Sequence, residues 1–399
     1  MTRVPQLDVA RGVAVFLVLG RHMQLPSEQA ASAVRAAAAL WYQVGWIAID
    51  LFFVLSGFLI AGLLFTEYQK HGSLRIGRFL IRRGFKIYPA FYVFLVASVL
   101  FSTYESPLTR DLVQRVLAEA LYVQNYLPPL WGPTWSLAVE EHFYLLLAVV
   151  LFVLVRRGRS QDNPFGGLVY LIVGLAVVAL ILRIATPPTH PYSYRKHFFP
   201  THLRLDSIAW GVLLSYLYHF RREQLLAFLE RRRWMIAVAS IALIAPPFIW
   251  PLEQSRFINT LGLTFLDWGF AGLLILSLSH SPSLRVPLGA PLLRGVAAIG
   301  FYSYSIYLWH MPVISWLMPH LRRRGVFDFS NATLAFTLDL AVYTIGSIAL
   351  GIVMARIVEG PALRLRDRLF ASRSGTLVAG GPVPRSEGLW RTPVTVSAA

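Results

Sequence analysis

Long apolar runs alternate with short polar segments along most of this chain of 399 residues. The runs are close to 20 residues, the length at which an α-helix crosses a hydrocarbon core about 30 Å thick. The shorter amphipathic stretch 109–126 is expected at the membrane interface. The pattern therefore predicts an all-α, polytopic membrane protein with ten transmembrane helices, over 7–23, 43–65, 87–104, 134–155, 166–184, 203–220, 234–250, 259–278, 296–317 and 333–356.

Composition agrees with this interpretation and narrows the chemistry. Hydrophobic residues make up 56% of the chain and charged residues only 14%, too few to cover a soluble protein of this size. The absence of cysteine excludes disulfides, thiolate catalysis and cysteine-ligated metal sites. The formal net charge of +17 would suit nucleic acid. However, Lys and Arg collect in the loops of one side, so the expected partner is the lipid bilayer and no nucleic acid is expected.

Loop charge predicts the orientation of the chain. Loops on the N-terminal side hold 24 of the 37 Lys and Arg residues, and the opposite loops hold 9. Because these residues accumulate on the cytoplasmic side of membrane proteins, both termini are expected in the cytoplasm. Residues 1–368 would form the membrane domain. Residues 369–399 are rich in Gly, Ser, Pro and Thr, and are expected to form a disordered cytoplasmic tail.

Arg11 and His22 lie eleven residues apart in the first predicted helix, so they share one helical face about 16 Å apart. Ionisable residues inside a membrane usually face a bundle interior or a water-filled cavity. The alternating directions of the helices place Arg11 in the inner half of the membrane. They also predict a basic inner entrance and an acid–base cluster in the outer half. The entrance comprises Arg78, Arg82, Arg83 and Lys86, and the cluster comprises His22, Asp50, Glu140, Glu141, Arg204, Asp206 and His310.

Such a layout favours base-assisted transfer of a group from a phosphate-bearing ligand. Arg and Lys bind phosphate through charge-assisted hydrogen bonds. A neutral His22 can act as a general base toward a hydroxyl when a carboxylate orients it, and Asp50 and Glu140 are the candidates. His310 would line the acceptor side. No G-x-S-x-G, H-E-x-x-H or phosphate-binding Gly motif is present, so neither a serine nucleophile nor a metal site is expected.

Seven short motifs in order along residues 5–368 give the chain a family resemblance. The chain resembles the acyltransferase-3 family of bacterial integral-membrane acyltransferases. The motifs are the R-x10-H spacing of Leu7–His22, Asp50–Ile60, the basic Arg82–Pro89, Trp135–Tyr144, Arg204–Gly211, Ser303–His310 and Glu359–Pro361.

The resemblance implies a bacterial cytoplasmic-membrane enzyme that transfers an acyl group, usually acetyl, from cytoplasmic acyl-CoA. The acceptor would be a hydroxyl of a glycan, a lipid-linked sugar or a secondary metabolite. Acyl-CoA would be a co-substrate, with no permanently bound cofactor. Lys86 stands where the family more often has Arg. Lysine keeps the positive charge but cannot make the two parallel hydrogen bonds that an arginine guanidinium makes to a phosphate. The site residues would be His22, Asp50, Glu140 and His310 for catalysis, Arg11, Arg82, Arg83 and Lys86 for the donor, and Trp135, Arg204 and Asp206 for the substrate.

Two functions from other classes compete with this hypothesis. A proton-coupled transporter could use Asp50, Glu140 and His310 as a relay. Inverted repeats with broken helices in matching halves would favour transport, and the sequence shows none. A structural subunit of a glycan-export complex is the other alternative, but it gives no reason for the histidines and carboxylates inside the membrane.

Overall fold

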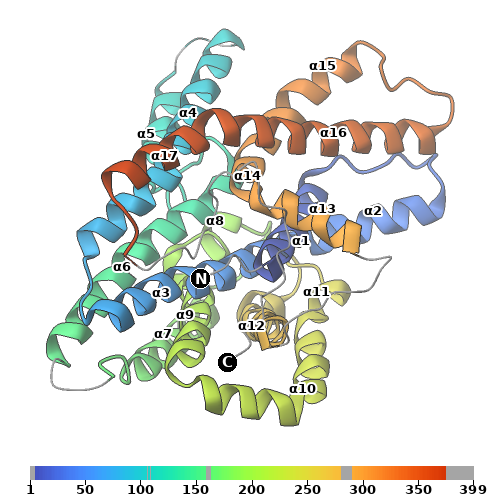
Figure 1. Cartoon of the computed structure of the whole chain (residues 1–399). Helices are drawn as coiled ribbons and strands as arrows, with labels where there is room; N and C mark the ends of the chain where they lie inside the picture. Colours follow the sequence, from blue (N-terminus) through green and yellow to red (C-terminus); the bar gives the residue numbers. More distant parts are fainter. Residues whose placement is uncertain (1–4, 106, 108, 159–162, 280–289, 374–399) are drawn as a thin grey trace, which may run out of the picture.

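A computed structural model describes residues 5–105, 107, 109–158, 163–279 and 290–373. These residues form helices and connecting turns, with no strand among them, which confirms the predicted all-α class. Figure 1 shows the order of the elements. The α-helices are α1 (Pro5–His22), α2 (Ser32–Val44), α3 (Ala48–His71), α4 (Ile76–Glu105), α5 (Arg110–Ala120), α6 (Trp135–Arg157), α7 (Leu168–Ala185), α8 (Tyr194–His197), α9 (Leu205–Phe220), α10 (Arg222–Ile244), α11 (Pro246–Ile249), α12 (Leu263–Ser279), α13 (Ala290–Phe301), α14 (Ser303–Pro312), α15 (Met318–Arg323), α16 (Ala332–Met354) and α17 (Gly360–Leu369).

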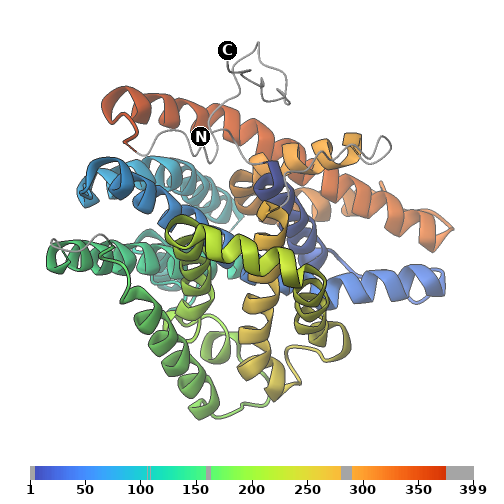
Figure 2. The same ribbon diagram turned by 60° about the horizontal axis from the view of Figure 1, so that its bottom comes forward.

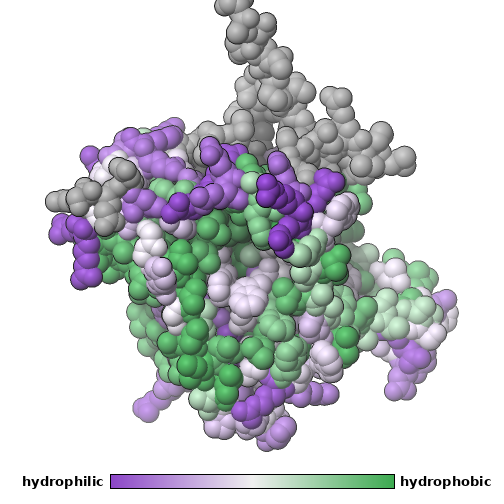
Figure 3. Space-filling view, turned by 90° about the horizontal axis from the view of Figure 1, so that it is seen from below, coloured by the Kyte–Doolittle hydropathy of each residue, from purple (hydrophilic) through white to green (hydrophobic). Residues whose placement is uncertain are grey.

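The molecule is a multi-pass membrane protein. Seven helical segments are long and apolar enough to cross a bilayer. Figure 3 shows apolar residues over the middle of one face, with hydrophilic residues toward its rims. The seven segments are Ser32–His71, Ile76–Tyr104, Gly132–Arg157, Leu168–Ala185, Arg222–Ile249, Ile258–Leu278 and Ala332–Leu369.

Every predicted span overlaps one or more helices, but the count of ten stays a prediction. Helix α9 is shorter than the seven segments, and α1 contains the charged residues Asp8, Arg11 and Arg21. The predicted span 296–317 is not one helix, because Tyr302 has non-helical backbone angles and separates α13 from α14.

Two stretches differ from the expected loops and tail. Helix α2 occupies residues that were expected to form a loop, and one turn, Gly45–Ile47, joins it to α3. Helices α16 and α17 are joined by the π-helical turn Ala355–Glu359, and they extend across the molecule in Figures 1 and 2. Of the predicted tail, residues 374–399 lie outside the described residues.

Close approaches at glycines bring the polar helices together. A Cβ atom added to Gly57 of α3 would lie 2.0 Å from the carbonyl oxygen of Ile208, and one added to Gly211 of α9 would lie 2.1 Å from that of Val54. Likewise, a Cβ on Gly300 of α13 would lie 1.8 Å from the carbonyl oxygen of Asp8 in α1. Small residues allow the backbones of membrane helices to approach in this way. As a result, the polar residues of α3 and α9 face one another.

Candidate active site

A cavity of about 130 Å³ lies among α1, α3, α4, α6 and α14. One wall is apolar and comes mainly from α3, which contributes Phe52, Leu59 and Ile60 among others. A second part of the lining, the charged wall, carries ionisable side chains from α1, α4 and α6, namely Arg11, Arg83, Lys86, Glu140 and Glu141. The cavity therefore combines room for an apolar chain with charged groups that can bind a polar ligand.

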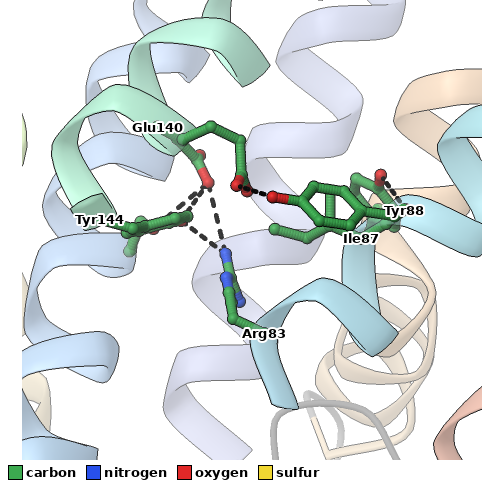
Figure 4. Close-up of polar contacts among 8 residues, drawn as sticks. Arg83, Ile87, Tyr88, Glu140 and Tyr144 are labelled. Carbon is green, nitrogen blue, oxygen red and sulfur yellow. Dashed lines mark hydrogen bonds and ion pairs between the residues drawn. The ribbon is translucent and has the colours of Figure 1, made fainter. Parts of the chain in front are cut away.

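Arg83 and Glu140 form the centre of the charged wall. The Arg83 guanidinium donates to the hydroxyl of Tyr144 at 2.5 Å, and its Nη2 lies 3.5 Å from Oε2 of Glu140 (Figure 4). Tyr144 in turn donates to Glu140, one turn away on the same face of α6, and its hydroxyl lies 2.5 Å from the Ser56 hydroxyl. The expected separation of these groups, with Arg83 at an inner entrance and Glu140 in an outer cluster, is therefore wrong.

The other cations predicted to bind the donor have acidic partners of their own. Lys86 forms an ion pair with Glu359, in the turn before α17. Arg11 lies 3.7 Å from Asp8. Arg82 does not line the cavity and pairs with Asp367 of α17 at 3.0 Å. The segment around α17 thus covers part of the predicted basic entrance and neutralises two of its cations.

His22 and His310 meet at the end of α1, 288 residues apart in sequence. Their nearest ring nitrogens, Nδ1 of His22 and Nε2 of His310, are 3.3 Å apart, and their ring centroids are 5.0 Å apart. Nδ1 of His310 lies 2.7 Å from the carbonyl oxygen of Tyr307, whose side chain lines the cavity. Tyr307 therefore connects the cavity to the histidine pair.

The predicted contact of Asp50 or Glu140 with His22 is not found. In the described part of the chain, the hydrogen-bond partners of His22 are the Val18 carbonyl oxygen and His310. Asp50 instead accepts from Arg204 at 2.6 Å, and both side chains are fully buried. Among the described residues, Asp50, Glu140 and His310 each have other hydrogen-bond partners and none bonds to another of the three.

Arg204 and Asp206, predicted to bind substrate, belong to a buried charge cluster outside the cavity lining. Asp206 pairs with Arg183 at 2.6 Å, beside the Asp50–Arg204 pair. Asp267 lies nearby, and its carboxylate oxygens have no hydrogen-bond partner in the described part of the chain. No group of three or more acidic, His or Cys residues among those described could hold a metal ion. We call these five residues the Asp–Arg cluster.

Trp135, also predicted to bind substrate, is a core residue. It is 4% exposed and stacks on Phe199 with ring centroids 5.0 Å apart. Its neighbours Ser136 and Leu137 line the cavity, but Trp135 does not. Sequence reasoning also missed Arg183 and Asp267, although each is an ionisable residue inside a predicted span, the same signal that identified Asp50.

A known family model matches most of this chain. The acyltransferase domain Acyl_transf_3 matches residues 4–356. The chain belongs to the acyltransferase-3 family. The match runs from α1 to the end of α16, so the cavity, the histidine pair and the Asp–Arg cluster all lie within the acyltransferase-3 domain. The family resemblance of the sequence motifs is confirmed.

Two curated relatives of the acyltransferase-3 chain are O-acetyltransferases. The peptidoglycan O-acetyltransferase OatA of Listeria monocytogenes is 27% identical over 339 residues, which are 80% of this chain and 50% of that protein. The O-acetyltransferase OatA of Staphylococcus aureus is 27% identical over 331 residues, 78% of this chain and 50% of that protein. The chain spans about half the length of these relatives. No solved structure matches it at a significant level.

Proposed function

We propose that the protein is a membrane O-acyltransferase that moves an acyl group, most simply acetyl, from acyl-CoA to a hydroxyl of an extracytoplasmic acceptor. The observation that carries the proposal is a cavity lined by charged side chains and by Tyr307, whose carbonyl oxygen bonds to His310 of the His22–His310 pair. The family membership and the relatives' names support the reaction class.

The shape of the cavity suits the slim arm of acyl-CoA. At about 130 Å³ it is smaller than the pockets of about 300–1,000 Å³ that hold whole drug-sized ligands. We therefore place the pantetheine and acyl chain against the apolar wall of α3, and the nucleotide outside the cavity. Lys86 and Arg82 would meet the phosphates there, in competition with Glu359 and Asp367.

The chemistry follows from a neutral His22 with a free ring nitrogen. Nε2 of His22 takes the proton of the acceptor hydroxyl while that oxygen attacks the thioester carbonyl. The carbon–sulfur bond then breaks, and the departing CoA thiolate receives that proton from His22, which returns to the neutral form. The products are the acyl ester and free CoA, so atoms balance without a covalent enzyme intermediate. Arg11 precedes His22 by about three turns on the continuous helix α1 and would contact the donor there.

A carbohydrate hydroxyl is the acceptor class that we propose first, because one relative is named a peptidoglycan O-acetyltransferase. Lipid-linked sugars and secondary metabolites are the other classes to test. We also propose a bacterial cytoplasmic membrane location with both termini in the cytoplasm, from the bias of Lys and Arg among the loops.

The test measures CoA release by the purified protein in nanodiscs with acetyl-CoA. Because the chain has no cysteine, a thiol reagent reports CoA without background from the protein. Muropeptides and lipid-linked sugars serve as acceptors, and mass spectrometry detects the added acetyl group. We expect His22→Ala to lower transfer about 10²- to 10⁴-fold. His320→Ala, at an exposed histidine of α15, is the matched control. A His22→Ala rate within a few-fold of the parent would refute the mechanism.

A further inference from the structure

We propose that His310 is the positioning residue for His22. Its Nε2 accepts the hydrogen on Nδ1 of His22 and so keeps the lone pair of the His22 ring on Nε2. The inference rests on the proposed function, in which that lone pair takes the proton of the acceptor. The neutral imidazole of His310 would then orient His22, a role that the sequence predicts for the carboxylate of Asp50 or Glu140.

The hydrogen bonds of His310 fix its tautomer. The side chain is fully buried, and its Nδ1 lies 2.7 Å from the carbonyl oxygen of Tyr307. A carbonyl oxygen can only accept a hydrogen bond, so Nδ1 of His310 must carry the hydrogen. No carboxylate bonds to His310 in the described part of the chain, and an unpaired charge at a buried position is costly. His310 is therefore neutral, and its Nε2 holds a lone pair.

The hydrogen bonds of His22 fix its tautomer as well. Its Nδ1 faces two acceptors, the carbonyl oxygen of Val18 at 2.9 Å and Nε2 of His310 at 3.3 Å. Because both partners only accept, Nδ1 of His22 carries the hydrogen, and Nε2 of a neutral ring is left free. Val18 lies one turn earlier on the same helix and moves with it. His310 belongs to α14, so its contact ties the imidazole to a second helix.

Tyr307 holds the His310 side chain in place. The Tyr307 carbonyl fixes its Nδ1, and the Tyr307 hydroxyl donates to the carbonyl oxygen of Pro133 at 2.6 Å. The same hydroxyl lies 2.7 Å from that of Ser136, at the start of α6. Since Tyr307 and Ser136 line the cavity, the position of the histidine pair depends on the cavity wall. His310 acts through His22 and is not itself required to touch the acceptor.

The test compares three substitutions of His310 in the nanodisc assay. His310→Gln can place an amide oxygen near the position of Nε2, His310→Asn is too short to do so, and His310→Leu keeps the bulk without an acceptor. A misplacement of about 1 Å costs on the order of 10²-fold in rate. We therefore expect kcat to fall about 10- to 100-fold in the Leu and Asn variants, with KM for acetyl-CoA unchanged within about twofold. The Gln variant should recover to within a few-fold of the parent.

A purely structural role for His310 gives a different pattern. The Gln and Leu variants would then have equal kcat, or their activity would follow their unfolding temperatures; either result overturns the inference. If His22→Ala is inactive while His310→Leu has full activity, only this inference fails. If His22→Ala is as active as the parent, the proposed mechanism fails together with this inference, and if the parent itself transfers no acetyl group, the proposed function fails.

A measurement on the parent protein does not depend on whether the His310 variants fold. Nitrogen-15 NMR of histidine-labelled protein distinguishes protonated from unprotonated ring nitrogens, and His22→Gln identifies the signals of His22. We expect a hydrogen on Nδ1 and a bare Nε2 in His22, with the same tautomer in His310. A protonated Nε2 on His22 in the resting protein would contradict the proposal.

Discussion

Replacing Arg204 tests whether the Asp–Arg cluster serves stability or chemistry. Arg204 and Asp50 are both fully buried, and their Nη2 and Oδ1 atoms are 2.6 Å apart. Removal of one partner from a buried ion pair leaves an uncompensated charge, which costs about 3–5 kcal/mol. Replacement of both partners by apolar residues of similar size is often neutral or stabilising. A structural pair therefore predicts a large loss in each single variant that is largely regained in the double variant.

The composition of the cluster predicts an order among the single variants. With Arg183, Asp206 and Asp267 included, the cluster has two cations and three carboxyl groups, and the Asp267 carboxyl group, buried without a hydrogen-bond partner in the described part of the chain, is counted as neutral. Arg204→Met leaves two carboxylates facing one cation and removes the hydrogen-bond donor of Asp50, whereas Asp50→Asn is nearly isosteric and keeps an oxygen that can accept from Arg204. We expect Arg204→Met to be the more damaging, with its unfolding temperature lowered by roughly 6–20 °C at about 2–4 °C per kcal/mol.

Intrinsic tryptophan fluorescence of the purified protein in detergent measures these unfolding temperatures, since the chain has 11 tryptophans. The set is Arg204→Met, Asp50→Asn, Asp50→Leu and the double variant Asp50→Leu with Arg204→Met. The CoA-release assay is run on each variant. If Asp50→Asn unfolds within about 1 °C of the parent yet loses transfer, the structural reasoning is refuted and Asp50 belongs to the catalytic set predicted from the sequence.

Three further predictions concern the entrance, an interface residue and the topology. Lys86→Ala should raise KM for acetyl-CoA about 10- to 100-fold with kcat retained, because a hydrogen bond to a charged group contributes about 1.5–3 kcal/mol. Lys86→Arg should restore binding. An unchanged KM would mean that Lys86 serves only in its ion pair with Glu359. Burial raises the pKa of Glu119 in α5 to about 7, despite the hydrogen bond that its carboxylate accepts from Thr134. Between the ordinary glutamate pKa of 4.5 and pH 7, the folded state therefore keeps a proton on Glu119 that the unfolded state has lost. Stability should therefore fall by about 3 kcal/mol as pH rises from about 4.5 to 7, and Glu119→Gln should abolish that slope in thermal unfolding; an equal slope in both proteins would contradict this. Reporter fusions at Lys70 and Pro107 should report opposite sides of the membrane, with Lys70 cytoplasmic, and matching signals would overturn the predicted orientation.

Local periodicity determined much of the fold from the sequence alone. An apolar run near 20 residues becomes a helix wherever it lies in the fold, because all its backbone hydrogen bonds close within the run. Each predicted span accordingly overlaps a helix, although the span 296–317 is divided between α13 and α14. Arg11 and His22 also lie on one continuous helix, as their eleven-residue spacing requires, since α1 runs from Pro5 to His22. The break at Tyr302 was not predicted, because no proline marks that position and apolar residues continue on both sides of it.

The partner of each buried polar group was decided only by the tertiary structure. Sequence position assigns a depth to Asp50, Glu140 and His310 but not a neighbour, since side chains at one depth can point to different helices. The close approach at Gly57 and Gly211 turns Asp50 toward Arg204, so it cannot orient His22. Glu140 meets Arg83 across α4 and α6. His22 is left with His310, a partner that the packing of α14 supplies from 288 residues away.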